Sequence, residues 1–322
     1  MRVLLFGGGG FIGSRLARQI AREPRLGARP IDELVLIDQR TVAPPESTAC
    51  RVSVVHADMR DEQVLDGLFA VRVDAVFHFA ASLTLDAETD FARGLQTNVL
   101  ALVGLLERCR AHPAAPLLLF ASSISTFGGT LPGVVGDDVF QAPTTSYGTQ
   151  KVLAEQLLAD YSRHGFLDGR ALRLPVVLTH PGPATGSVAD QVASLIREPL
   201  RGQRTTCRMA PDSRLAVASV DNVVRSFIHL GGLPQGALQG VRTMNLPALT
   251  VTPAQIVHAV ERRLPDDGAA RVAWEHDAKL QEIIDGWPSG FTSARALALG
   301  VKADESIDAV VDAFLAAEEA GA

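Results

Sequence analysis

A tyrosine and a lysine stand four residues apart in "SYGTQK", at the start of a stretch with helical spacing (residues 146–165). The chain has only two tyrosines and three lysines. Positions i and i+4 lie on one face of a helix, so Tyr147 and Lys151 are expected to be neighbours. An ammonium group beside a phenol lowers the phenol's pKa from its ordinary value of about 10. The pair therefore predicts a general base that takes the proton of an alcohol.

Hydroxyl side chains follow an apolar run in "PLLLFASSISTFGG" (116–129). Ligands of parallel sheets bind at the carboxyl ends of the strands. A hydroxyl such as that of Ser123 could hold a substrate oxygen within reach of the base. Together with Tyr147 and Lys151, this cluster indicates a dehydrogenase, which removes a proton as hydride leaves the carbon. A serine-rich turn without chemistry is the alternative.

A glycine loop, "FGGGGFIGSRLA", joins the first apolar run to a helical stretch. Gly7, Gly10 and Gly13 allow a tight turn whose backbone approaches a pyrophosphate at the helix N-terminus. Asp38 closes the second strand, where a carboxylate can bind both adenosine ribose hydroxyls and repel a 2′-phosphate. We therefore expect NAD rather than NADP, although Arg40 could accommodate the phosphate.

Two further segments suit the same cofactor. Asp58 and Met59 follow the third apolar run and could bracket the adenine. The small residues of "HFAAS" (78–82) end the fourth run, where the backbone of the cofactor would pass. Ordinary loop and core residues would look the same.

Short apolar runs alternate with helical stretches over the first half of the chain. The expected strands are 2–6, 33–38, 51–57, 74–80, 116–122 and 170–178. Such continuous runs indicate strands covered on both faces. Strand–helix alternation predicts an α/β fold, a Rossmann-like doubly wound parallel sheet. The pattern loosens later, so we expect an NAD-binding domain over 1–174 and a smaller mixed α/β substrate lobe over 175–322. The lobes should pack closely, and some segments could return to the first domain.

Composition narrows the class of protein. The net charge of −6 favours no nucleic-acid partner. Three isolated cysteines fit a reducing cytoplasm and no metal site. No apolar run approaches the length of a membrane span, and the first run enters the glycine loop, which indicates a strand rather than a signal peptide.

These motifs, with Asn98 in "TNVLALVGLL", resemble the extended short-chain dehydrogenase/reductase family, which includes NAD-dependent epimerases and dehydratases. The resemblance covers nearly the whole first domain. It implies that Tyr147 accepts the proton, Lys151 is its partner, Ser123 holds the substrate and Asn98 lies near the active site. It also implies a homodimer, in which helices near 97–111 and 147–164 pair. The cofactor-binding residues implied are Gly7, Gly10, Phe11, Ile12, Gly13, Asp38, Asp58, Met59, Phe79, Ala80, Ala81, Asn98, Tyr147, Lys151, Leu174 and Val176.

Longer stretches such as "DYSRHGFLDGRALRLP" and "NLPALTVT" resemble family members that oxidise the hydroxyl beside the carboxylate of a four-carbon sugar acid with NAD. A buried carboxylate needs charged or multiple donors. Arg214 is our first choice, followed by Arg173 and Arg197. The loop "HPGPAT" (180–185) replaces the "RPGKPN" expected there, which leaves a different hydroxy acid open. The substrate residues expected are Ser82, Ser123, Tyr147, His180, Arg197 and Arg214.

Two other functions remain open. One is a nucleotide-sugar epimerase or reductase of the same fold. A dehydratase would place an acid beside the catalytic serine, and Ile124 and Ser125 stand there instead. The other is a protein that senses the dinucleotide without turnover, although such a protein has no need of a tuned phenol.

Overall fold

The computed structural model describes residues 1–47, 49–178, 188–264 and 271–319. The chain divides into two compact units. Unit 1 comprises 1–126, 141–173 and 224–244, and unit 2 comprises 127–140, 174–223 and 245–322. Unit 2 resumes at Leu174, whereas the substrate lobe was expected to begin at residue 175. Two segments are exchanged, since 127–140 belong to unit 2 and 224–244 to unit 1.

A seven-stranded sheet forms the centre of unit 1, with the order β12-β8-β7-β6-β1-β4-β5. The strands are β1 (Arg2–Phe6), β4 (Glu33–Asp38), β5 (Arg51–His56), β6 (Ala75–His78), β7 (Leu117–Ser123), β8 (Asp168–Leu174) and β12 (Thr243–Asn245). Strands β5, β4, β1, β6 and β7 pair in parallel. Because β6 lies on one side of β1 and β4 on the other, the loops after β1 and β6 meet where the strand order reverses, the usual ligand site of such sheets.

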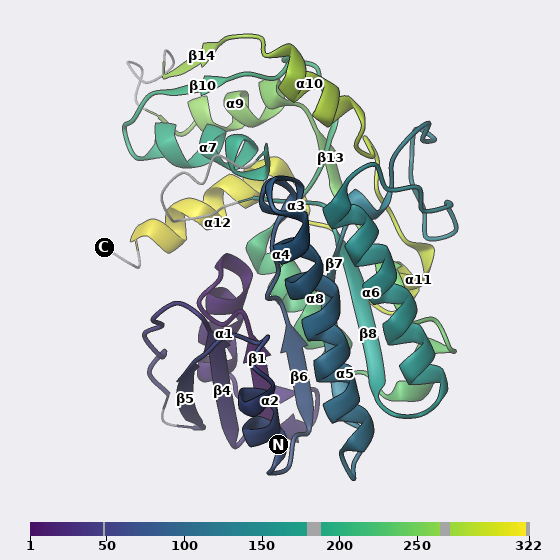
Figure 1. The fold of residues 1–322 in the computed structure, drawn as a ribbon. Coiled ribbons are helices and arrows are strands. Elements are labelled where there is room, and N and C mark those ends of the chain that lie inside the picture. Colours follow the sequence, from purple (N-terminus) through teal and green to yellow (C-terminus); the bar gives the residue numbers. More distant parts are fainter. Residues whose placement is uncertain (48, 179–187, 265–270, 320–322) are drawn as a thin grey trace. The chain divides into compact units, whose positions relative to one another are not determined.

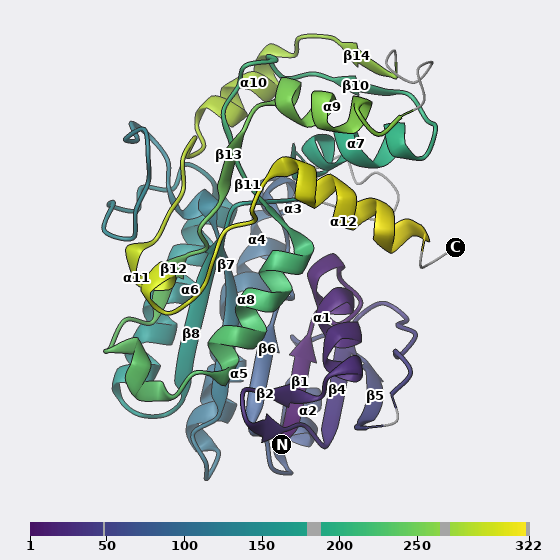
Figure 2. The same cartoon turned by 180° about the vertical axis from the view of Figure 1, so that it is seen from behind.

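Helices cover both faces of this sheet. On one face lie α2 (Glu62–Phe69), α5 (Ala101–Ala111) and α6 (Ser146–Arg163), as Figure 1 shows. On the other lie α1 (Phe11–Arg22) and α8 (Val220–Gly232), seen in Figure 2. The short elements of this unit are β2 (Arg25–Leu26), β3 (Arg29–Pro30), α3 (Thr84–Thr89), α4 (Phe91–Leu95), the π-helix η1 (Gln96–Leu100), η2 (Ile124–Thr126) and η3 (Gln235–Leu238). Covered faces explain the continuous apolar runs, and the expected Rossmann-like α/β fold is confirmed.

Pro175 divides the last strand expected for the first domain. Residues 170–178 read as one strand, but the structure has β8 in the large sheet and β9 (Val176–Leu178) in a three-stranded sheet of unit 2. A proline has no N–H to donate to a neighbouring strand, so the ladder stops there. The chain thus leaves unit 1 at the residue that cannot continue its sheet.

Unit 2 has its own apolar core, which includes Val192, Ile196, Val217, Ile256 and Phe314. Its small sheets are β13-β11-β9 and β10-β14. Besides β9, its elements are α7 (Val188–Leu200), β10 (Thr205–Cys207), β11 (Leu215–Ser219), β13 (Leu249–Val251), α9 (Pro253–Glu261), β14 (Val272–Trp274), α10 (Ala278–Asp285), α11 (Ala294–Ala298) and α12 (Ile307–Glu319). A mixed α/β unit was expected here. Within the described ranges, no helix combines the length and apolar character that crossing a membrane requires.

Candidate active site

The glycine loop between β1 and α1 leaves no room for side chains. Gly7 has a φ of +82°, and a Cβ there would lie 2.7 Å from the backbone nitrogen of Ala80. A Cβ on Gly13 would lie 2.0 Å from the carbonyl oxygen of Gly7. Gly10 is the N-cap of α1 and supplies no side-chain cap. The loop therefore presents bare backbone at a helix N-terminus, a cradle that fits a dinucleotide pyrophosphate.

Asp38 lies beside this loop with its carboxylate held in place. It is 7% exposed, and it accepts hydrogen bonds from the backbone nitrogens of Gly9 and Arg40, each at 2.9 Å. The Nε of Arg40 also donates to it, at 3.2 Å. The Arg40 side chain is 63% exposed, so a cation covers the carboxylate from the solvent side. The carboxylate expected to bind the ribose and the arginine expected to compete with it thus form one ion pair.

The residues expected around the adenine are occupied in other ways. Asp58 accepts three hydrogen bonds from the Arg60 side chain, at 2.6 to 3.0 Å, and these hold the pKa of its carboxyl below the ordinary value. Met59 is 6% exposed and belongs to the core of unit 1. Asp58 can still present an oxygen at the surface, but Met59 offers little side chain to a ligand.

The segment after β6 is tied to the π-helix through Asn98. The Oδ1 of Asn98 accepts from the Ser82 nitrogen at 2.8 Å, and its Nδ2 donates to the Ser82 oxygen at 2.9 Å. Nδ2 also donates to Oε1 of Gln150 at 2.6 Å. Asn98 therefore joins the segment after β6 to α6. Phe79, Ala80 and Ala81 lie half-buried next to the glycine loop.

Ser123, Tyr147 and Lys151 come together at the carboxyl end of β7. Ser123 is the last residue of the strand, and its hydroxyl acts to lower the pKa of the Tyr147 phenol. The ammonium of Lys151 donates to the Ala121 oxygen at 2.8 Å and lies 5.5 Å from the centre of the Tyr147 ring. All three residues are at most 9% exposed. The structure thus assembles the three expected catalytic residues.

Gly148 allows α6 to reach this position. A Cβ at residue 148 would lie 2.0 Å from the carbonyl oxygen of Ser125, just beyond β7. The helix begins there because the Thr145 hydroxyl accepts from the Gly148 nitrogen at 3.0 Å and caps the first turn. The glycine of "SYGTQK" is therefore a packing requirement between the two reactive residues.

Burial dominates the protonation of the pair. It raises the pKa of Tyr147 to about 12, against the effect of the hydrogen bond with Ser123. It lowers the pKa of Lys151 to about 7, against the charge of Glu155. The direction for Tyr147 is opposite to the expectation that Lys151 lowers it. The reason is desolvation of the buried phenol, and the ammonium of Lys151 donates to the Ala121 oxygen.

Two residues that the sequence analysis did not select also lie in this region. Burial, with the charge of Lys151, lowers the pKa of His78 to about 3, so the ring is neutral. Glu155 follows Lys151 by four residues and binds Ser122 and Arg173. The i+4 spacing after Lys151 was the available signal for Glu155. For His78 there was none, since a histidine in an apolar strand reads as core.

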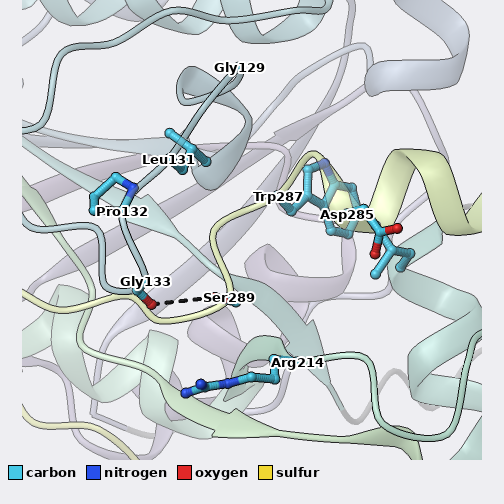
Figure 3. Close-up of a pocket in the computed structure, with 9 residues that line it drawn as sticks. Gly129, Leu131, Pro132, Gly133, Arg214, Asp285, Trp287 and Ser289 are labelled. Carbon is cyan, nitrogen blue, oxygen red and sulfur yellow. Dashed lines mark hydrogen bonds between the residues drawn. The ribbon is translucent and has the colours of Figure 1, made fainter.

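The arginines considered for a substrate carboxylate differ in availability. In unit 1, Arg173 is held by Glu155. In unit 2, Arg197 is 1% exposed and is paired with Asp190 at 2.7 Å and Glu198 at 2.8 Å. Arg214 is exposed and lines a pocket of about 230 Å³ with Asp285, Trp287 and Ser289 among others. Figure 3 shows its side chain extended below the Ser289–Gly133 hydrogen bond in that view.

For the remaining residues expected to bind the cofactor or substrate, the structure shows position and burial only. Leu174 and Val176 are buried at 7% and 4% on either side of Pro175. Phe11 and Ile12 open α1 and are half-buried. His180 lies outside the described residues.

Comparison with known proteins places these features in context. A model of the "NAD dependent epimerase/dehydratase family" matches residues 3–235. The chain is similar to D-erythronate dehydrogenases of Cupriavidus necator (40% identity, 100% of this chain and 99% of the relative) and Haemophilus influenzae (36%, 98% and 99%). A solved nucleoside-diphosphate-sugar epimerase from Agrobacterium tumefaciens superposes with a TM-score of 0.94 at 29% identity, over 100% of this chain and 95% of that one. Both curated relatives are named dehydrogenases, which confirms the expectation of an oxidoreductase.

Proposed function

Because the chain belongs to the NAD-dependent epimerase/dehydratase family, we propose that it is an NAD-dependent dehydrogenase that oxidises the 2-hydroxyl of a small sugar acid to the 2-oxo acid. The observation that carries the chemistry is that Ser123, Tyr147 and Lys151 are buried together, with the Lys151 ammonium 5.5 Å from the centre of the Tyr147 ring. Full-length likeness to two D-erythronate dehydrogenases supports the substrate class and makes D-erythronate the first compound to test.

The bare glycine loop and Asp38 would hold the pyrophosphate and the adenosine ribose of NAD, and Lys151 would hold the nicotinamide ribose. When bound, the oxidised nicotinamide accepts the hydride. Ser123 would donate a hydrogen bond to the substrate oxygen. Tyr147 would first release its own phenolic proton to solvent, and the phenolate Oη would then receive the hydroxyl proton. The Ser123 hydroxyl acts on the pKa of the Tyr147 phenol, so a substrate oxygen held by Ser123 would lie near the base.

We assign the substrate carboxylate to Arg214. Arg173 and Arg197 are committed to buried carboxylates, whereas Arg214 lines a pocket and is exposed. Arg214→Ala should raise the KM for the sugar acid about 10–100-fold, the scale of a lost charge-assisted hydrogen bond. The KM for NAD should barely move. Arg208→Ala is the control, since Arg208 is also exposed in unit 2 but does not line this pocket. An unchanged KM for the acid in Arg214→Ala would reject the assignment.

The direct test is reduction of NAD in the presence of single substrates. The panel contains D-erythronate, its stereoisomers, other 2-hydroxy acids, L-threonine and UDP-sugars. We expect turnover with a four-carbon sugar acid and the matching 2-oxo acid as product. Turnover of a nucleotide sugar alone would support the second candidate, an epimerase or reductase, which the likeness to the Agrobacterium structure favours. Binding of NAD without turnover of any compound would indicate a sensor.

Assembly and location are part of the same proposal. We propose a homodimer paired through η1, α5 and α6, where Leu100 of η1 and Leu153 of α6 are 56% and 45% exposed. Light scattering coupled to gel filtration tests it, because Leu153→Glu should yield monomers. We also propose a cytoplasmic protein, because Cys50, Cys109 and Cys207 are all free thiols.

A further inference from the structure

Glu155 is a buried carboxylate one helical turn beyond Lys151 on α6. It is 2% exposed, and three different segments donate hydrogen bonds to it. Ser122 donates from the end of β7, and Gln141 donates from the segment before α6 at 2.9 Å. The Arg173 fork on β8 donates through Nε at 3.1 Å and through NH2 at 2.9 Å. Donors from three segments therefore hold the carboxyl group in one orientation.

The partners of Glu155 place it beside the group formed by Ser123, Tyr147 and Lys151. Ser122 lies between Ala121, whose oxygen binds the Lys151 ammonium, and Ser123, whose hydroxyl acts to lower the pKa of Tyr147. Lys151 and Glu155 thus hold consecutive residues of β7 from consecutive turns of one helix face. This double attachment fixes the distance between the strand that carries Ser123 and the helix that carries Tyr147.

We propose that Glu155, oriented by Arg173, is a positioning residue of this site: it keeps Lys151 in its ammonium form and ties α6 to the end of β7. The proposal rests on the function proposed above, because it concerns the same Tyr147–Lys151 pair. Its physical basis is that a buried ammonium loses its hydration and needs a fixed negative charge to remain protonated.

Among the charged and titratable groups around Lys151, Glu155 is the one that raises the pKa of Lys151. From α6 they are Tyr147, whose raised pKa keeps it neutral at pH 7, and Glu155. From β6 comes His78, whose lowered pKa keeps it neutral. From β7 come the Ala121 carbonyl and the Phe120 ring, 4.5 Å from the ammonium. Arg173 on β8 acts through Glu155. Burial brings the pKa of Lys151 to about 7, and Glu155 opposes that fall.

The test measures the pKa of Lys151 directly. The chain has three lysines, and Lys279 and Lys302 are exposed. The variant Lys279→Arg/Lys302→Arg therefore leaves Lys151 as the single lysine for NMR titration with carbon-13 at the ε position. In this background, Glu155→Gln should lower the pKa of Lys151 by about 1 or more, because a favourable negative charge is removed. Loosened packing would admit water and raise the pKa toward its ordinary value. A fall in the pKa of Lys151 would therefore indicate loss of the charge interaction with Glu155, and a rise would indicate loosened packing.

Two further variants complete the experiment. Glu155→Gln removes the carboxylate partner of the buried Arg173, which can prevent folding. Glu155→Gln/Arg173→Gln removes both charges and should still lower the pKa of Lys151, because Glu155 is the partner that acts on Lys151 directly. The matched control is Asp168→Asn, which breaks another buried ion network of unit 1, with Arg170 and Arg242, and should leave that pKa unchanged.

Activity provides the second measurement. In Glu155→Gln, the fall of kcat/KM at alkaline pH should begin at a lower pH, by the same amount as the NMR shift. An unchanged or raised Lys151 pKa in both Glu155 variants would overturn the proposal. The NMR titration needs no substrate, so a failure of the sugar-acid assignment would appear separately, as wild-type protein without turnover.

Discussion

The fold buries the side chains of Ser123, Tyr147 and Lys151, and this burial sets the protonation of Tyr147 and Lys151. Tyr147 and Lys151 are 9% and 3% exposed, and burial moves both pKa values toward the neutral form. The phenol of Tyr147 is therefore protonated at neutral pH. In the reaction we propose, Tyr147 loses its proton only when charges and hydrogen bonds around it favour the anion, which is the role we propose for Ser123 and Lys151.

The chain offers a matched pair of tyrosines for testing the base. Tyr147→Phe should reduce turnover at least ~10²–10⁴-fold, the usual contribution of general acid–base catalysis. Its affinity for NAD, measured by calorimetry, should stay within a few-fold of wild type, because the phenol acts on substrate. Tyr161→Phe is the control, since Tyr161 donates to Glu107 on the helix α5. Turnover of Tyr147→Phe within about tenfold of wild type would exclude it as the base.

Cofactor choice depends on Asp38 and Arg40 as a pair. We expect at least tenfold higher kcat/KM with NAD than with NADP, which is about 1.4 kcal/mol at the transition state. Arg40→Ala should increase that preference, because it removes the cation that could accept a 2′-phosphate. Asp38→Asn should reduce it, because the negative charge is lost. Initial rates with both cofactors check this, and equal rates in the wild type would mean that Arg40 outweighs Asp38.

At the scale of elements, the site depends on how closely α6 approaches the end of β7. Gly148→Ala would place a Cβ 2.0 Å from the Ser125 oxygen, so the helix start must move away from Ser123. We expect a loss of kcat of at least about 100-fold, since small misplacements of reacting groups are costly. Gly67→Ala in α2 is the control, because a Cβ there meets nothing within 4 Å. That variant should gain up to ~1 kcal/mol of stability by urea unfolding and keep its kcat. Normal turnover of Gly148→Ala would contradict the close-packing argument.

The elements of unit 1 were accessible from sequence because each buried strand leaves a continuous apolar run and each turn carries its glycines. The bounds 2–6 and 33–38 agree with β1 and β4 to the residue. The prediction of one strand over 170–178 was wrong, because the apolar character continues through Pro175 but the backbone pairing does not. The cluster of Ser123, Tyr147 and Lys151 followed from type and spacing. The role proposed for Glu155 could not be predicted from type and spacing, because it depends on contacts with Ser122, Gln141 and Arg173, which are distant in sequence.

At the scale of the whole molecule, the exchange of segments between the units was not readable from local patterns. Residues 127–140 and 224–244 lie in the middle of stretches that belong to the other unit. Local periodicity reports which face of an element is buried, but it carries no information on which core buries it. The pocket with Arg214 also draws on segments near residues 131 and 287, so only the arginine itself could be proposed from sequence.

Stability of the folded chain should depend on pH through His78, which is 1% exposed between Phe6 and Phe120. Its folded pKa is about 3, below the ordinary value of 6.5. The unfolded chain therefore gains a proton below pH 6.5 that the folded chain refuses. The stabilisation by the neutral ring is complete above pH 6.5 and is lost as the pH falls toward 3. Between pH 7 and 4.5, this histidine alone should cost roughly 2–3 kcal/mol of unfolding free energy.

The substitution His78→Leu isolates that contribution. The variant should lose roughly 2–3 kcal/mol less than wild type between pH 7 and 4.5, measured by urea unfolding with circular dichroism. His258→Leu is the matched control, because the His258 side chain is 70% exposed and its removal should leave the pH dependence unchanged. An identical loss in His78→Leu and wild type would show that the ring is protonated in the folded state. The buried ammonium of Lys151 would then share its surroundings with a second cation, and Glu155 would have to balance both.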